Sequence, residues 1–181
     1  MIYDLTQELL RSVVYPGDPA PMALPILRMD EGDDINLTAL SLCAHNGTHV
    51  DAPRHFIRDG KSVTDLPLSV FVGKAEVIAF ENREKILASR CERILLKGCE
   101  EIGEELATRL CKKEICLVGL EGQSVGNANV HQCLLSREIV LLEGIRLKDV
   151  PEGIYTLVAA PLKLSGFEGS PCRAILLDEV N

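Results

Sequence analysis

Three of the four histidines of the chain, His45, His49 and His55, lie within eleven residues, and Asp51 lies between the second and the third. The dipeptide Asn46-Gly47 between the first two histidines predicts a turn. A loop, and not one face of a regular helix, would therefore bring the first two imidazoles together. A chain that concentrates its histidines in this way around a carboxylate is a candidate for metal binding.

The residues after the turn predict an extended segment. Pro53 biases the residue before it toward extended geometry, so we expect residues 48–52 to form a strand. In a strand, His49 and Asp51 project to one side, and Val50 projects to the other side, into the core. The side chains of His45, His49 and Asp51 would then converge on one point.

Two neutral imidazoles and a carboxylate are suitable ligands for Zn²⁺, Mn²⁺ or Fe²⁺, and three protein ligands leave one position open for water. A bound divalent ion lowers the pKa of that water from ~15.7 to about 7. His55 would lie beside the ion, and its ordinary pKa of about 6.5 suits proton transfer. From the spacing alone, two alternatives stay open: a polar loop, or a hydrogen-bonded His/Asp cluster that holds no metal.

Length and composition exclude several classes of protein. A chain of 181 residues fits one domain, residues 1–181. A net charge of −8 with scattered basic residues argues against a nucleic-acid surface, and no apolar run reaches the ~18 residues that span a membrane. The seven cysteines form no C-x-x-C pair and follow a polar N-terminal segment, which predicts reduced thiols in a cytoplasmic protein.

Apolar runs and alternating patterns predict many strands and few helices. The predicted strands cover residues 35–42 (half-buried, with a bulge near its centre), 75–80, 93–96, 115–120, 139–142, 155–160 and 174–177. Helices are predicted over residues 100–113 and about 129–136. This pattern indicates a sheet-rich α/β domain whose sheet curls toward a barrel.

The segment of residues 45–56, HNGTHVDAPRHF, resembles the H-x-G-T-H-x-D-x-P-x-H-F signature of the metal-dependent cyclase-like hydrolase family. That family includes bacterial kynurenine formamidases and isatin hydrolases. The similarity extends to the turn YPGD at residues 15–18 and to three later segments, at residues 150–153, 160–164 and 170–174. It therefore covers nearly the whole chain.

The resemblance implies a β/β/α swivelling-type fold with a small barrel-like mixed sheet, and a homodimer or larger homo-oligomer. It implies that His45, His49 and Asp51 bind metal, and that His55 donates and accepts the proton. A second ion would be held with help from a downstream histidine and a glutamate twelve residues later, a spacing that His131 and Glu143 match. Two zinc or manganese ions per chain are thus expected.

The activity that the resemblance implies is hydrolysis of a small amide, as in aryl formamidases. Metal-bound hydroxide would attack the carbonyl while His55 moves the proton to the leaving nitrogen. The alternatives are an isatin-type cyclic amide hydrolase, a dehydratase or cyclase, a non-catalytic metal-binding module, and a structural zinc domain.

Two departures from the family pattern concern substrate recognition. Tyr15 stands in the early turn, where kynurenine formamidases tend to have a tryptophan that lines the substrate pocket. Residues 120–126, LEGQSVG, lack the aspartates that the family often has on either side of the serine. We therefore expect Tyr15 to contact the substrate, and we expect formylkynurenine to be only one of several possible substrates.

Overall fold

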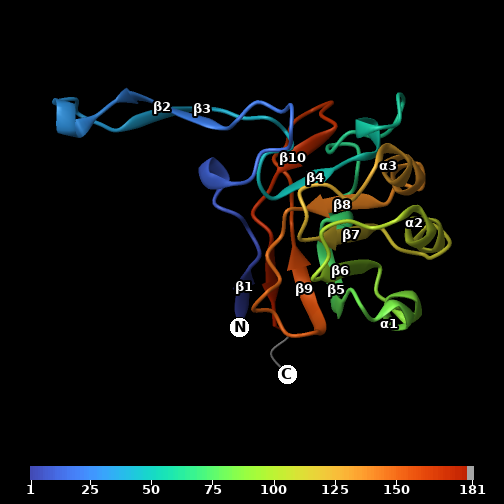
Figure 1. Cartoon of the computed structure of the whole chain (residues 1–181). Coiled ribbons are helices and arrows are strands. Elements are labelled where there is room, and N and C mark those ends of the chain that lie inside the picture. The colour runs from blue at the N-terminus through green and yellow to red at the C-terminus, as the bar shows by residue number, and fades with distance from the viewer. Residues whose placement is uncertain (179–181) are drawn as a thin grey trace.

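A nine-stranded mixed sheet dominates the computed structural model, which describes residues 1–178. The strand order is β1-β11-β9-β5-β6-β7-β8-β4-β10. The bounds are β1 Ile2–Asp4, β4 His49–Asp51, β5 Val72–Ala79, β6 Arg93–Lys97, β7 Leu117–Leu120, β8 Val140–Glu143, β9 Gly153–Val158, β10 Gly169–Pro171 and β11 Ile175–Leu177. The sheet curls into a half-barrel (Figure 1), so the predicted sheet-rich α/β domain with a barrel-like sheet is confirmed.

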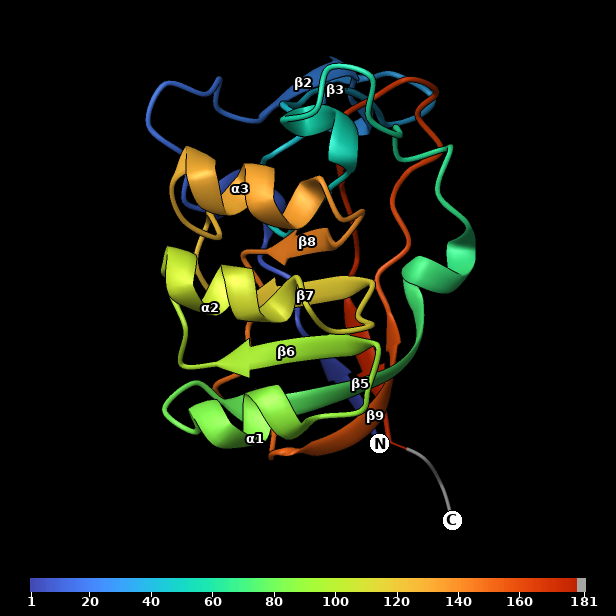
Figure 2. The same ribbon diagram turned by 90° about the vertical axis from the view of Figure 1, so that its right-hand side faces the viewer.

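The centre of the sheet is parallel, because strands β5 to β8 pair in that direction. Parallel strands need crossover connections, and three helices supply them: α1 Arg83–Ala88, α2 Glu104–Leu110 and α3 Ala128–Leu135. All three helices cover the same face of the sheet (Figure 2). The central strands are therefore buried on both faces, which explains why they read as continuous apolar runs.

Alternate residues of these strands enter two separate apolar layers. Ile94 and Leu96 of β6 pack toward the helices, whereas Leu95 packs inside the curl of the sheet. The inner layer also contains Val50 of β4, which is fully buried. This confirms the prediction that Val50 points away from its two polar neighbours.

Strand β4 lies between β8 and β10 and is antiparallel to both. The register places His49 directly opposite Glu143. The candidate ligand segment is thus held by strands that lie about a hundred residues further along the chain, and its geometry is fixed by backbone pairing on both sides.

The predicted helix over residues 100–113 is longer than the observed α2. Ile102 is buried, and its backbone N–H donates to the carbonyl of Val125, which holds the segment before the helix in a non-helical path. Gly103 then occupies the N-cap position. The short elements β1, β10 and α1 were not predicted, because three to six residues show too little periodicity.

A separate two-stranded sheet, made of β2 Met22–Leu27 and β3 Leu37–Ser41, projects from the body of the molecule (Figure 1). We call residues 21–42 the arm. The prediction of a half-buried strand here is wrong, because every residue of β3 is exposed. The register irregularity lies in β2, between Pro25 and Leu27, and not in β3 as predicted.

Among the helices of residues 1–178, none combines the length and the apolar content needed to cross a membrane.

Candidate metal and catalytic site

Four elements bring the predicted site residues to one place. His45 lies in the loop before β4, His49 and Asp51 lie in β4, and His55 ends the short 3₁₀ helix Pro53–His55. His131 lies in α3, and Glu143 is the last residue of β8. The four histidines, Glu143 and Tyr15 line one pocket of about 320 Å³, and Asp51 lies fully buried behind it.

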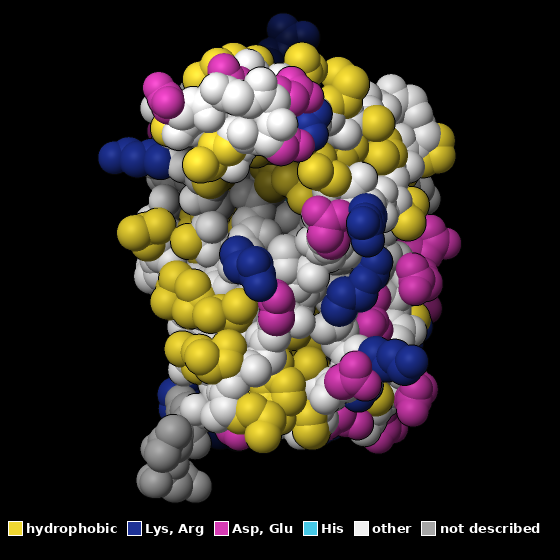
Figure 3. All heavy atoms as spheres, turned by 90° about the vertical axis from the view of Figure 1, so that its left-hand side faces the viewer, with side chains coloured by type: hydrophobic (Ala, Val, Ile, Leu, Met, Phe, Trp, Pro, Cys, Tyr) yellow, Lys and Arg dark blue, Asp and Glu magenta, His cyan; other side chains and the backbone are white. Residues whose placement is uncertain are grey.

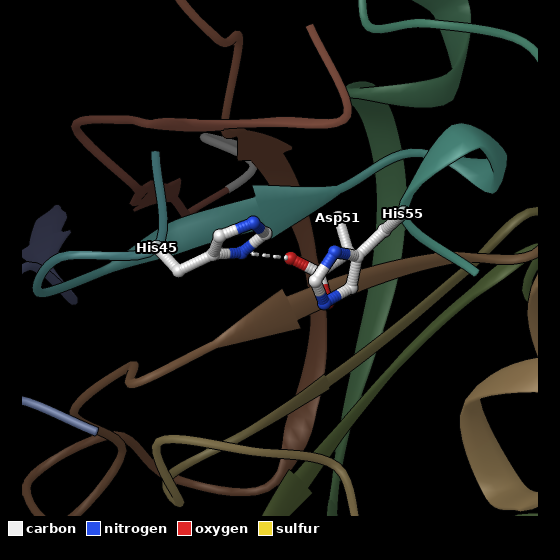
Figure 4. A group of neighbouring side chains, drawn as sticks. All are labelled: His45, Asp51 and His55. Carbon is white, nitrogen blue, oxygen red and sulfur yellow. Dashed lines mark hydrogen bonds and ion pairs between the residues drawn. The ribbon is translucent and has the colours of Figure 1, made fainter. Parts of the chain in front are cut away.

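Asp51 is at the centre of the cluster. Its Oδ1 accepts a hydrogen bond of 2.9 Å from His45 Nδ1 (Figure 4). Its Oδ2 lies 3.8 Å from both His55 Nε2 and His131 Nε2, and it is buried without a hydrogen-bond partner in the described part of the chain. Among residues 1–178, His45 Nε2 likewise has no hydrogen-bond partner, and it lies 3.6 Å from Glu168 Oε1. Because an unsatisfied buried carboxylate oxygen is costly, its position among imidazole nitrogens fits a cation.

Glu143 provides the second carboxylate. Its Oε2 lies 3.2 Å from His49 Nε2, and its Oε1 lies 3.5 Å from His131 Nε2. The same Oε1 accepts a hydrogen bond of 2.6 Å from the backbone N–H of Val125. This bond fixes the carboxylate between two imidazoles.

Two groups of three side chains have ligand atoms close enough to hold an ion: His45 with Asp51 and His55, and His49 with Asp51 and Glu143. Asp51 belongs to both groups, and one carboxylate has two oxygens to offer. The grouping differs from the expected one, since it separates His45 from His49 and places His55 among possible ligands. His131 lies outside both groups, although its Nε2 faces both carboxylates.

Backbone carbonyls orient two of the imidazoles. His49 Nδ1 donates to the carbonyl of Gly47 at 3.0 Å, and His131 Nδ1 donates to the carbonyl of Asn127 at 3.0 Å. When such a ring is neutral, Nε2 is the nitrogen without a proton, and it faces the carboxylates. Metal-binding histidines in proteins typically use this arrangement.

The carboxylates change the proton affinity of the imidazoles. Burial lowers the pKa of His49, but its hydrogen bond to Glu143 and the nearby charges of Asp51 and Glu143 outweigh burial and raise the pKa to about 9. For His131 as well, the hydrogen bond to Glu143 overcomes burial, so that its pKa is raised. Burial and the neighbouring imidazoles lower the pKa of His55, which keeps its ring neutral near pH 7.

Aromatic and amide side chains complete the pocket. The ring of Phe56 stacks on His131 with centroids 4.5 Å apart, and Tyr15 lies at the wall with 48% of its surface exposed. Gln123 and Asn127 also line the pocket. Asn127 is a site residue that the sequence analysis did not predict; the observed helix begins one residue earlier than predicted, with Asn127 as its N-cap, a position that asparagine favours.

A sheet-rich α/β domain with a buried His/Asp/Glu cluster behind a small pocket has the features of a metal-dependent hydrolase. Residues 3–117 match the family described as putative cyclase. Kynurenine formamidase from Bacillus anthracis is 32% identical, over 96% of this chain and 95% of the relative. Kynurenine formamidase from Salinibacter ruber is 33% identical, over 92% of each chain.

Solved structures agree with this similarity. A potential metal-dependent hydrolase with cyclase activity is 28% identical and superposes with a TM-score of 0.83, over 100% of this chain and 99% of the other. Isatin hydrolase A from Labrenzia aggregata shares the fold, with 24% identity and a TM-score of 0.84 over 99% and 94% of the chains. The chain belongs to the putative cyclase family, and it is a hydrolase of carbon–nitrogen bonds other than peptide bonds.

Proposed function

We propose that this protein hydrolyses a small amide, with an aryl formamide as the first candidate substrate. The observation that carries the proposal is the position of Asp51, which is fully buried and belongs to two potential ligand groups at the back of the pocket. The similarity to kynurenine formamidases over nearly the full length supports the choice of substrate class.

In this proposal, His45, His49, Asp51, His131 and Glu143 hold one or two divalent ions, zinc or manganese. A divalent ion at this position would polarise a carbonyl and lower the pKa of water. The protein's own contribution is a fixed, water-poor ligand set, since His49, Asp51 and Glu143 are almost completely buried.

His55 is the proposed proton carrier. It is less buried than the ligand candidates, with 28% of its side chain exposed, and it lines the pocket. Its lowered pKa leaves the ring neutral and able to take a proton, which it can pass to the departing nitrogen. Phe56 and Tyr15 would contact the aromatic part of the substrate.

The first experiment combines metal analysis with a substrate panel. Wild type should hold close to two ions per chain, and His131→Ala should hold fewer. His55→Ala should keep its metal and lose turnover by ~10²- to 10⁴-fold. A His55→Ala protein that loses metal would assign His55 to the ligand set, and unchanged turnover would remove it from the mechanism.

The panel separates the remaining candidates. Only an aryl formamide releases formate, whereas an isatin-type cyclic amide opens to a single product. Metal binding without turnover of either class would support a non-catalytic module. A structural zinc domain is distinguished by chelation, because it would unfold.

We further propose that the arm pairs with a second copy of this chain. An isolated two-stranded sheet is marginally stable in water, yet this one exposes apolar side chains on both faces. These residues are Met22, Leu24, Ile26, Met29, Ile35, Leu37, Leu40 and Leu42, each 37–60% exposed. Eight half-exposed side chains offer several hundred Å², on the order of the ~800 Å² per partner that a stable interface buries.

The face of the body from which the arm projects provides a complementary surface. Yellow apolar side chains gather on this face, around and below the projecting arm (Figure 3). Val13 and Tyr15, in the segment that leads into the arm, are also exposed. A two-fold dimer would cover both arms at once, because each copy would present the same surfaces.

Two statements about the whole chain stay predictions. We infer that residues 1–181 act as one hydrolase domain, because the ligand candidates come from residues 45–55 and from residues 131–143. All seven cysteines are free, which is compatible with the cytoplasmic location predicted from the sequence.

A further inference from the structure

Two glutamines outside the ligand set connect three segments of the site. Gln7 is 9% exposed, and its Nε2 donates to the carbonyl of Gly144 at 2.7 Å and to Gln123 Oε1 at 3.1 Å. Gln123 Nε2 in turn donates to the carbonyls of Gly47 at 2.8 Å and His45 at 3.3 Å. One chain of amide hydrogen bonds thus runs from the end of β8 to the loop before β4.

Each accepting carbonyl belongs to a ligand candidate or to a neighbour of one. The carbonyl of Gly47 also accepts the N–H of His49 Nδ1, so its position determines the direction of that ring. Gly144 directly follows Glu143, and its carbonyl accepts a second bond from Thr48 Oγ1 at 2.7 Å. The glutamines therefore act on His45, His49 and Glu143 together.

We propose that Gln7 and Gln123 form an amide clamp that positions the His45–His49 loop against Glu143 and so determines the metal affinity of the site. The inference rests on the proposed metal-dependent function. It makes both glutamines positioning residues, because neither is a ligand candidate and each acts through a backbone carbonyl. Groups that orient metal ligands in this way typically change metal affinity or activity 10- to 100-fold when they are removed.

The chemistry of the clamp requires an amide at position 123. Gln123 donates through Nε2 and accepts through Oε1 at the same time, and an ionised carboxylate can only accept. A glutamate there would place its negative charge against the carbonyls of Gly47 and His45 without a donor between them.

The test measures Zn²⁺ affinity by competition with a chromophoric chelator, using Gln123→Glu, Gln7→Met and the double variant. Each single variant should bind Zn²⁺ 10- to 100-fold more weakly than wild type. The double variant should be about as weak as the weaker single variant, because the two side chains act as one unit. The matched control is Gln132→Met, an exposed glutamine of α3, which should bind within twofold of wild type.

A spectroscopic readout separates positioning from general stability. In Zn²⁺-loaded wild type, imidazole NMR should show His49 with its proton on Nδ1, and Gln123→Glu should shift or broaden that resonance. Should Gln123→Glu fail to fold, the Zn²⁺ affinity and the His49 resonance of Gln7→Met test the clamp instead. Wild type that binds no Zn²⁺ would overturn the proposed function itself. If wild type binds Zn²⁺ and the clamp variants show the same Zn²⁺ affinity and the same His49 tautomer as wild type, the clamp proposal alone is overturned.

Discussion

Asp51 shows what sequence spacing can and cannot predict about single residues. The histidine spacing and the strand alternation predicted that His45, His49 and Asp51 converge; in the structure Asp51 lies close to both imidazoles, but His45 and His49 belong to different ligand groups. The spacing and the alternation did not show that Asp51 belongs to two ligand groups, because that depends on Glu143 and on the path of the chain after Pro53. The amide clamp was not visible either, since Gln7 and Gln123 are 116 residues apart.

Gly144 provides a prediction at the residue scale. Its φ of +67° is in the left-handed region, and an added Cβ would lie 2.4 Å from Gln7 Nε2 and 2.7 Å from the carbonyl of Gly47. Gly144→Ala should therefore lose ~1–2 kcal/mol from backbone conformation alone, with a further loss from the clash. Urea unfolding monitored by circular dichroism measures the sum of these two losses of stability.

The control for this variant is Gly98→Ala. Gly98 has a similar φ of +74°, but no atom of residues 1–178 lies within 4 Å of an added Cβ. The difference between the two variants isolates the contact with the clamp, and only Gly144→Ala should also weaken metal binding. Equal losses of stability, with metal binding intact in both, would contradict the tight contact at Gly144.

Elements differ in how far their sequences predict them. The strands β5 to β8 were predicted because burial on both faces leaves continuous apolar runs. The three-residue strands β1 and β10 carry no such pattern, and they form only because long-range partners pair with them. The prediction that residues 35–42 form a half-buried strand failed for a physical reason. Alternation of apolar and polar residues normally marks one buried face, but here both faces of the strand are exposed within the single chain.

Helix α3 links the stability of an element to the site. The side chain of Asn127 caps the helix by accepting the N–H of Val130 at 3.1 Å, and its backbone carbonyl orients His131. Asn127→Ala should cost ~1 kcal/mol of stability, because one helix N–H loses its acceptor. It should also lower the metal affinity measured by chelator competition.

Helix α1 supplies the matched control for the cap. The side chain of Asn82 caps α1 in the same way, by accepting the N–H of Lys85 at 3.1 Å, and α1 contains none of the site residues. Asn82→Ala should lose a similar amount of stability and keep wild-type metal affinity. If both variants bound metal equally well, the cap of α3 would have no part in placing His131.

The whole molecule is expected to be a dimer joined through its arms. Leu24 and Leu40 lie on opposite faces of the arm, because Leu40 pairs with Ala23 and not with Leu24. Leu24→Lys or Leu40→Lys should therefore shift the mass measured by sedimentation equilibrium from that of two chains to that of one. Thr108→Lys, which adds the same charge at an exposed polar position of α2 away from the arm, is the control.

The dimer prediction has a clear negative outcome. Wild type that sediments as a single chain at tens of micromolar would show that no second copy covers the arm. Loss of metal content in the two leucine variants would instead show that the arm supports the site through the loop that begins at Cys43.

The position of β4 between β8 and β10 has a consequence for how the protein is made. The ribosome produces the segment from His45 to His55 early, but the strands that flank β4 come from residues 140–143 and 169–171. An emerging chain therefore exposes its histidines long before the carboxylate of Glu143 and both neighbouring strands exist. The complete ligand set of the proposed metal site can therefore form only when synthesis is nearly finished.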